Sequence, residues 1–372
     1  MGDASPGEIV LMGCGDVGPL HEPVDAYSTL VRSTLATADI RFAQCEKVYS
    51  ERGAMQVHSN GHYTRQPPRL ASVFADCGFN VVSVAGNHSM DWGGEALLDT
   101  IEIMRGMGIQ TVGGGANIDE ARKPALFEIR GVRVGILGYS SVLREGYEAT
   151  AHRSGVAPMR AHTYYQPQEY QAGTPPRVVT VPVEEDIELF CRDIAALRAR
   201  VDVVIVSLHW GIHIIPRELA DYEHIVARAA FEHGADLLLG HHQHIPKAIQ
   251  VFGNKVCFHG LSHFIFSQRE LDKHLPAHVG GNRYGVEHDP EYPRLPFGMA
   301  AKRSLIAKAV LTRSGVKRVS FLPVIIDTQL RPEVVRAPDP RFAEAVGYME
   351  WASAGVPHRF VVEGDEVVVL PA

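Results

Sequence analysis

The sequence predicts an α/β fold, because apolar segments of strand length alternate with segments of helical periodicity. Strands are expected over residues 8–13, 39–45, 81–85, 110–112, 125–129, 132–139, 201–208 and 235–239. Helices are expected over residues 68–77, 95–107, 184–199 and 219–233. The strands are almost continuously apolar, which is typical of a sheet that helices cover on both faces. Later segments, over 248–258, 304–312, 316–326 and 359–369, are expected to form hairpins.

The composition is that of an ordinary soluble globular protein. The chain has 372 residues, 45% of them hydrophobic and 21% charged, which is enough for a large core. Its formal charge of -7 gives no basic surface, so neither nucleic acid nor an anionic membrane is an expected partner. The five cysteines lie far apart and show no CxxC spacing, which argues against disulfides or a thiolate zinc site. The start MGDASPGEIVLM does not resemble a signal peptide, and we expect a cytoplasmic protein.

Two long stretches are expected to be irregular. Residues 142–182 are rich in Tyr, Pro, Gln and His, and residues 267–300 are rich in Pro, Gly and His. Long loops inside a compact domain are usually functional, so we expect both stretches to border the site and to determine substrate selectivity. Arg144, Arg153 and Arg160 of the first stretch are either solvated, as loop arginines usually are, or bind a substrate carboxylate.

Polar side chains gather where five of the predicted strands end. These ends read Gly13-Cys14-Gly15-Asp16, Cys45-Glu46, Gly86-Asn87-His88, His209-Trp210-Gly211 and Gly240-His241-His242-Gln243-His244. In open α/β sheets, ligands bind outside the carboxyl ends of the strands. Carboxylates, an amide oxygen and imidazoles together suit a divalent metal such as Mn, Fe, Zn or Ca. Each residue alone is commonly a turn former or a solvated side chain, but the combination predicts a metal site.

The order GD, CE, GNHSMDWG, HWG and GHHQH resembles the metal site of the poly-γ-glutamate capsule biosynthesis (CapA-like) family. That family belongs to the calcineurin-like metallophosphatase superfamily, and the matching motifs run from Asp16 to about Phe266. The resemblance implies a four-layer α/β/β/α sandwich in a single large domain. Residues 1–330 would form this domain, both long stretches included. Residues 331–372 would add a C-terminal helix and hairpin packed on the same domain.

The resemblance also implies roles for individual residues. One or two divalent metals would be held by Asp16, Glu46, Asn87, His209, His241 and His244, with Glu46 as the bridge if two bind. His88 matches the histidine beside the reacting group, and Asp91 matches its partner. His242 is expected to face the substrate as a further catalytic group. From their places after ligand motifs, Trp92 and Trp210 are expected either to wall a substrate pocket or to be ordinary packing, and His263, an imidazole that the family pattern lacks, is expected to contact the substrate.

Three positions depart from the superfamily pattern. Gly18 stands where the first motif usually has histidine, and Cys45-Glu46 replaces a longer acidic motif, so one metal position is short of ligands. His21 either compensates or is an exposed loop residue, and His213 either faces the cleft or belongs to the core or a loop. Capsule proteins of the family are commonly membrane-anchored and this chain shows no anchor, which argues against a capsule role.

The site predicts a metal-dependent enzyme that acts on a peptide, polyglutamyl or other amide substrate. Its chemistry suits amide hydrolysis or epimerisation at an α-carbon, as in the lasso-peptide epimerases that are related to this family. One alternative is a phosphomonoesterase or phosphodiesterase. The other is a non-enzymatic accessory protein of capsule or polyglutamate synthesis. Since a fold does not determine function, the sequence leaves the substrate, the metal and the oligomeric state open.

Overall fold

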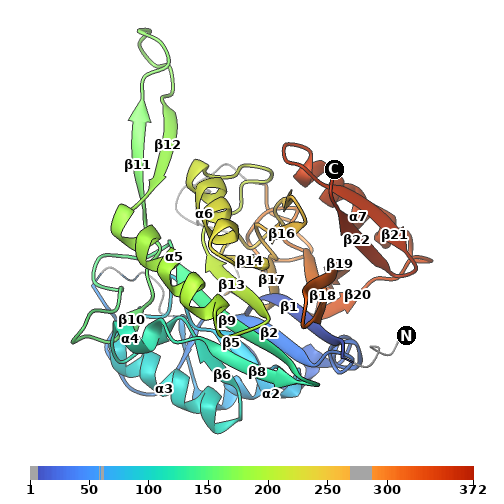
Figure 1. The fold of residues 1–372 in the computed structure, drawn as a ribbon, viewed down its shortest axis with the longest axis horizontal. Helices are drawn as coiled ribbons and strands as arrows, with labels where there is room; N and C mark the ends of the chain where they lie inside the picture. The colour runs from blue at the N-terminus through green and yellow to red at the C-terminus, as the bar shows by residue number, and fades with distance from the viewer. Residues whose placement is uncertain (1–6, 58, 60–62, 269–286) are drawn as a thin grey trace.

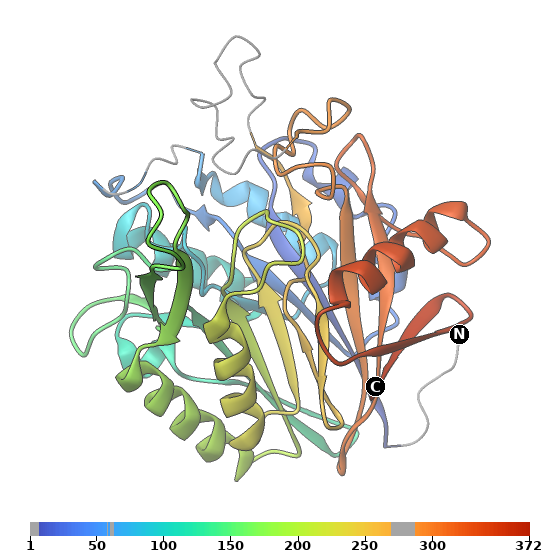
Figure 2. The same cartoon turned by 90° about the horizontal axis from the view of Figure 1, so that it is seen from above.

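Two β-sheets face each other at the centre of the fold (Figure 1, Figure 2). The structure is a computed structural model that describes residues 7–57, 59, 63–268 and 287–372. The first sheet has the strand order β21 (Arg359–Glu363), β22 (Glu366–Leu370), β19 (Gly315–Ile326), β18 (Arg303–Thr312), β1 (Ile9–Gly18), β2 (Ile40–Cys45), β5 (Val81–Ser83) and β6 (Gln110–Val112). Two further strands join it: β17 (His263–Phe266) pairs with β1, and β20 (Pro332–Val334) pairs with β19.

The second sheet is smaller. Its order is β15 (Ile249–Phe252), β16 (Lys255–Phe258), β14 (Leu237–His241), β13 (Val203–His209), β9 (Val132–Ser140) and β8 (Ala125–Ile129). β9, β13, β14 and β16 are parallel to one another, as are β1, β2, β5 and β6 in the first sheet. Because parallel neighbours point the same way, each sheet brings several carboxyl ends to one edge.

Helices cover the outer face of each sheet. α2 (Ser72–Asp76) and α3 (Gly93–Gly106) cover the first sheet, and α5 (Glu184–Arg198) and α6 (Asp221–Glu232) cover the second. A core between the sheets joins Leu11 of β1 to Ile205 of β13 and Leu239 of β14. Two further hydrophobic cores lie on the outer faces of the sheets, and each joins one sheet to the helices that cover it. The predicted α/β/β/α sandwich is therefore confirmed.

The remaining elements are short. They are the helical turns η1 (Val24–Ser28), α1 (Arg32–Leu35), η2 (Pro68–Ala71) and α4 (Ile118–Ala121), and the strand pairs β3 (Val48–Tyr49) with β4 (Arg65–Gln66) and β7 (Gly114–Gly115) with β10 (Gly155–Val156). The helix expected over 68–77 is divided between η2 and α2. No helix in the described ranges is both long and apolar enough to cross a membrane.

The stretch 142–182 is not wholly irregular, contrary to the prediction. β11 (Ala161–Gln166) and β12 (Arg177–Pro182) form a hairpin that projects from the body and pairs with no other described strand (Figure 1). Tyr164 and Tyr165 of β11 are exposed, so the strand lacks the buried apolar pattern by which strands are predicted from sequence. Of the stretch 267–300, residues 269–286 lie outside the described part of the chain.

The C-terminal segment joins the same layers. β22 pairs with β19, and α7 (Pro340–Ser353) places Phe342 and Met349 in the core between the sheets. A helix and a hairpin thus follow residue 331. The domain boundary at residue 330 stays a prediction.

The core between the sheets should dominate the stability of the fold. Ile205→Ala removes a fully buried side chain of that core, and we expect a loss of about 2–5 kcal/mol in the free energy of unfolding. Ile225→Ala on α6 is the matched control, because that side chain is 43% exposed and should cost much less. Chemical denaturation of both variants measures the difference. Equal losses would contradict the assignment of the core.

Candidate metal centre

The carboxyl ends of the two sheets bring together most of the residues predicted as metal ligands. The first sheet supplies the oxygen donors: Asp16 from within β1, Glu46 just after β2 and Asn87 after β5. The second sheet supplies imidazoles: His209 and His241 end β13 and β14, and His242 and His244 follow. Asp16 lies inside its strand rather than beyond it, because β17 pairs with β1 and extends it past the predicted end. Oxygen and nitrogen donors therefore face each other across the sandwich.

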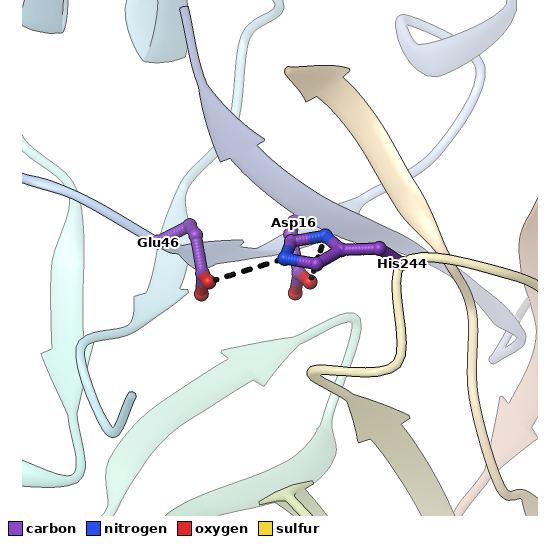
Figure 3. A group of neighbouring side chains, drawn as sticks. All are labelled: Asp16, Glu46 and His244. Carbon is purple, nitrogen blue, oxygen red and sulfur yellow. Dashed lines mark ion pairs between the residues drawn. The ribbon is translucent and has the colours of Figure 1, made fainter. Parts of the chain in front are cut away.

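Asp16, Glu46 and His244 form the tightest group. One ligand atom from each lies within 4.8 Å of the other two. Figure 3 shows the His244 ring beside both carboxylates, with one dashed line from the ring to each. Its Nδ1 lies 3.4 Å from Asp16 Oδ2, and its Nε2 lies 3.6 Å from Glu46 Oε1.

Glu46 also faces His209, which in turn contacts Asn87. Its Oε2 lies 3.7 Å from Nε2 of His209, and that nitrogen lies 2.7 Å from Oδ1 of Asn87. One carboxylate oxygen thus faces His244 and the other faces His209. This is the arrangement that a bridging carboxylate requires.

The two neighbouring histidines of the GHHQH motif take different places. His241 lies with its Nδ1 3.5 Å from Asp16 Oδ1 and packs against the Phe42 ring. The ring of His242 lies 5.0 Å from that of His209, between centroids, so it belongs to the same end of the cluster as Asn87 and His209. His242 is therefore placed as a candidate ligand as well as a candidate catalytic group. His213 lies beside His242, with 5.1 Å between the two ring centroids. Of the alternatives left open for His213 from the sequence, this favours the one in which it faces the site.

The electrostatics of the cluster fit a bound cation. Burial raises the pKa of Asp16, and burial together with the Asp16 charge raises the pKa of Glu46 well above its usual value. Burial lowers the pKa values of His209, His242 and His244, which favours their neutral, metal-binding form. These atoms find no hydrogen-bond partner in the described structure: Asp16 Oδ1, both Glu46 oxygens, and Nδ1 of His209, His242 and His244. Since buried polar atoms are nearly always paired, the donor set fits a divalent metal.

A second feature, the pair His88 and Asp91, adjoins the cluster. His88 Nδ1 lies 2.7 Å from Asp91 Oδ2, and the His88 side chain is 18% exposed while Asp91 is fully buried. The Tyr147 hydroxyl donates to Asp91 Oδ1 at 2.8 Å, and an Arg144 nitrogen lies 3.7 Å from that oxygen. Burial disfavours the Asp91 carboxylate, but the hydrogen bonds from His88 and Tyr147 outweigh it and lower the pKa of Asp91.

The comparison with known families agrees with this site. The model of the family described as bacterial capsule synthesis protein PGA_cap matches residues 11–268, which is more than half of the chain and includes every predicted ligand. The chain belongs to this PGA_cap family. The PGA biosynthesis protein CapA of Bacillus subtilis (strain 168) is 28% identical over 197 residues, which are 53% of this chain and 45% of that protein.

One more relative and one solved structure are also similar to this PGA_cap protein. A probable polyglutamine synthesis accessory protein of Mycobacterium tuberculosis (strain H37Rv) is 29% identical over 190 residues, 49% of this chain and 43% of that protein. The chain thus spans less than half the length of these two curated relatives. The calcineurin-like phosphoesterase YfkN of Bacillus subtilis aligns with a TM-score of 0.38 and 12% identity, over 83% of this chain and 87% of that one.

The structure accounts for the glycine that replaces histidine in the first motif. A Cβ atom at Gly18 would lie 3.0 Å from both Cγ and Cδ of Lys47, so the lysine stem fills the space beside this position. Nζ of Lys47 donates to the Ser267 carbonyl at 2.8 Å. Burial lowers the pKa of Lys47 to about 7, although the Glu46 charge opposes the shift. A histidine at position 18 would require this side chain to move.

The residues predicted to contact substrate lie in three different environments. Trp210 is fully buried, stacks on His259 and donates from Nε1 to its carbonyl at 2.9 Å. It belongs to the core between the second sheet and its helices, and its expected contact with the substrate stays a prediction. Trp92 is partly exposed and carries the Arg65 guanidinium 3.8 Å above its ring, and its role stays a prediction. His263 is fully buried, with its ring centroid 5.7 Å from that of His244.

Sequence reasoning did not identify Tyr147 or Phe297 as parts of the site. Tyr147 is 56 residues from Asp91, and Phe297 stacks on His244 with centroids 4.4 Å apart. Both come from the long stretches predicted to border the site. Of the three arginines that the sequence analysis considers in 142–182, Arg160 pairs with Asp186 and Arg153 with Glu148, whereas Arg144 adjoins Asp91. No motif in the sequence distinguishes these positions.

Replacing His244 should impair metal binding. The His244 side chain faces both carboxylates, so His244→Ala should strongly reduce the affinity for a divalent metal. The loss should exceed the ~10–100-fold that is typical of removing a residue that only hydrogen-bonds a ligand. His224→Ala is the matched control, because that histidine hydrogen-bonds Gln250 on the outer side of the second sheet. Elemental analysis and chelator competition on the full chain measure both. Unchanged affinity in His244→Ala would contradict the ligand assignment.

Proposed function

We propose that this PGA_cap protein is a metal-dependent enzyme that acts on a polyglutamyl, peptide or other amide substrate. The observation that supports this most strongly is the His88–Asp91 pair beside the Asp16, Glu46 and His244 cluster. A cluster alone suits storage or structure, whereas an oriented and partly exposed imidazole next to it suits proton transfer.

The metal would be held by Asp16, Glu46, Asn87, His209 and His244, together with His241 or His242. When bound, a divalent metal supplies Lewis-acid polarisation of a carbonyl or phosphoryl oxygen and lowers the pKa of water. Mn, Fe and Zn suit the mixed oxygen and nitrogen donors better than Ca, because four imidazoles converge here. Whether one or two ions bind depends on the position that Gly18 leaves without a histidine.

The chain's own residues would move the proton. Because the Asp91 carboxylate faces Nδ1 of His88, the proton of the neutral ring is held there and Nε2 is left to accept one from the substrate or water. The lowered pKa of Asp91 keeps this partner ionised, and Tyr147 holds it in place. His242 would assist from the side of the second sheet. This machinery serves amide hydrolysis, and it equally serves removal and return of an α-proton in epimerisation.

The family supports the polyglutamyl class of substrate. The names of the two relatives refer to PGA biosynthesis and polyglutamine synthesis, and this chain aligns with less than half of each. An accessory role without turnover would match the second name, and a phosphoester substrate would match the metal cluster. A panel that contains a γ-glutamyl amide, an α-peptide and an aryl phosphate separates these alternatives.

His88 should be required for turnover but not for metal binding. His88→Ala should lower turnover about 10²–10⁴-fold, because it removes a positioned acid or base, and should leave the metal content unchanged. Asp91→Asn should lose less, because it keeps the ring but weakens its orientation. His233→Ala, at the exposed end of α6, is the control. The measurement pairs turnover on the panel with metal stoichiometry.

The outcomes separate the alternatives. Turnover of the amide or peptide substrate, lost in His88→Ala, supports the proposal. Turnover of the aryl phosphate alone favours the phosphoesterase. Loss of metal in His88→Ala, or wild-type turnover in that variant, would show that the role given to His88 is wrong.

A further inference from the structure

Two buried glutamines adjoin the ligands without being ligands in any motif. Gln44 lies on β2, two residues before Glu46, and Gln243 lies between His242 and His244. Both side chains are fully buried. Burying an amide is unfavourable unless its hydrogen bonds compensate, so the contacts of each indicate what it does.

Gln44 connects two strand ends of the first sheet. Its Nε2 donates to the Ala85 carbonyl at 3.1 Å and to the Cys45 carbonyl at 3.4 Å. Cys45 directly precedes Glu46, and Ala85 is two residues before Asn87. The amide therefore joins the backbone that carries one oxygen ligand to the backbone that carries the next.

Gln243 makes the equivalent connection in the second sheet. Its Nε2 donates to the carbonyls of Trp210 and His259, each at 2.9 Å. Trp210 directly follows His209, so the amide joins the end of β13 to the GHHQH segment. The residues on either side of Gln243 have φ angles of +97° at His242 and +56° at His244. Non-glycine residues adopt such angles only where surrounding contacts hold them.

Glycines of the metal motifs make room for both amides. A Cβ atom at Gly86 would lie 3.0 Å from Nε2 of Gln44. At Gly211 it would lie 2.7 Å from Nε2 of Gln243, and at Gly260 it would lie 2.5 Å from Oε1 of the same residue. Glycines recur beside the ligands in the sequence, and at these three positions the structure gives the reason. The orientation of each amide follows from its partners, because carbonyl oxygens accept and only the NH₂ group donates.

We propose that Gln44 and Gln243 are positioning residues that set the spacing of the metal ligands, one in each sheet. This inference rests on the proposed metal-dependent function. Gln44 fixes Glu46 relative to Asn87, and Gln243 fixes His209 relative to His242 and His244. In both residues Oε1 has no hydrogen-bond partner among the described residues. Each amide thus leaves its Oε1 acceptor unpaired, which costs free energy, while both N–H bonds of its NH₂ group donate to backbone carbonyls.

The test replaces each glutamine by methionine, which has a similar length and cannot donate. Gln44→Met and Gln243→Met should each weaken binding of Mn²⁺ or Zn²⁺ to the full chain about 10–100-fold, as the loss of an outer partner of a ligand does. Kd is measured by chelator competition, and the melting temperature is measured in chelator. Gln243→Asn is a second variant. Asparagine keeps the amide, but its side chain is one methylene shorter and cannot contact the same carbonyls, so this variant too should bind the metal more weakly.

Asn80 offers the matched control. It joins β2 to β5 at their opposite ends: Arg41 N–H donates to its Oδ1, and its Nδ2 donates to the Asp39 carbonyl, each at 2.8 Å. Asn80→Leu should therefore lower the melting temperature of the metal-free protein and leave the Kd unchanged. An equal loss of affinity in Asn80→Leu would show that the effect is one of general stability and would overturn the proposal.

The remaining outcomes are equally decisive. If either methionine variant binds the metal with wild-type affinity, the positioning role is overturned while the proposed function stays intact. If Gln243→Met does not fold, wild-type affinity in Gln243→Asn has the same meaning. Absence of metal binding by the wild type contradicts the proposed function itself and removes the basis of this inference.

Discussion

The site depends on two carboxylates, Asp16 and Glu46, that are held together in the interior. Both are almost completely buried, and burial raises the pKa of each. Ionising two adjacent buried carboxyls without a counter-charge is strongly unfavourable. Lys47 supplies only part of that charge: its attraction lowers the pKa of Glu46, but burial lowers the pKa of Lys47 itself to about 7 and its Nζ is hydrogen-bonded to the Ser267 carbonyl. Burial lowers the pKa values of His209, His242 and His244 as well, so a metal ion is the counter-charge that this environment favours.

The sandwich gives the metal site a particular construction. The first sheet contributes the oxygen donors and the second contributes the nitrogen donors, so the distance between them depends on the core between the sheets. Packing there is close: a Cβ atom at Gly13 would lie 2.9 Å from Cδ1 of Leu239. The same strands that carry the ligands, β1 and β14, therefore also set the separation of the two halves. Gln44 and Gln243 then fix the spacing within each half.

Much of this arrangement was accessible from the sequence. The alternation of apolar strands with helices predicted the α/β class, but not that each sheet has helices on one face only. The resemblance to the CapA-like family implied the four layers, and the polar residues at the strand ends predicted which side chains would meet. The hairpin β11–β12 escaped prediction because its strands are exposed and their aromatic residues face solvent. Tyr147 and Phe297 were not predicted as parts of the site, because contacts between distant parts of the chain, rather than any motif, bring them to Asp91 and His244. The place of Trp210 directly after a ligand does not reveal that its side chain is fully buried.

The most direct test of the account is whether metal binding releases protons. Calorimetric titration with Mn²⁺ or Zn²⁺, repeated in buffers of different ionisation enthalpy, measures this number. Since the pKa values of Asp16 and Glu46 are raised, the metal-free carboxyls hold protons at mildly acidic pH, and binding should release them, less so as the pH rises. The lowered pKa values of His209, His242 and His244 favour their neutral form, so these three histidines should contribute little. Binding without proton release at mildly acidic pH, or no binding at all, would contradict the claim that this buried pair is a metal centre.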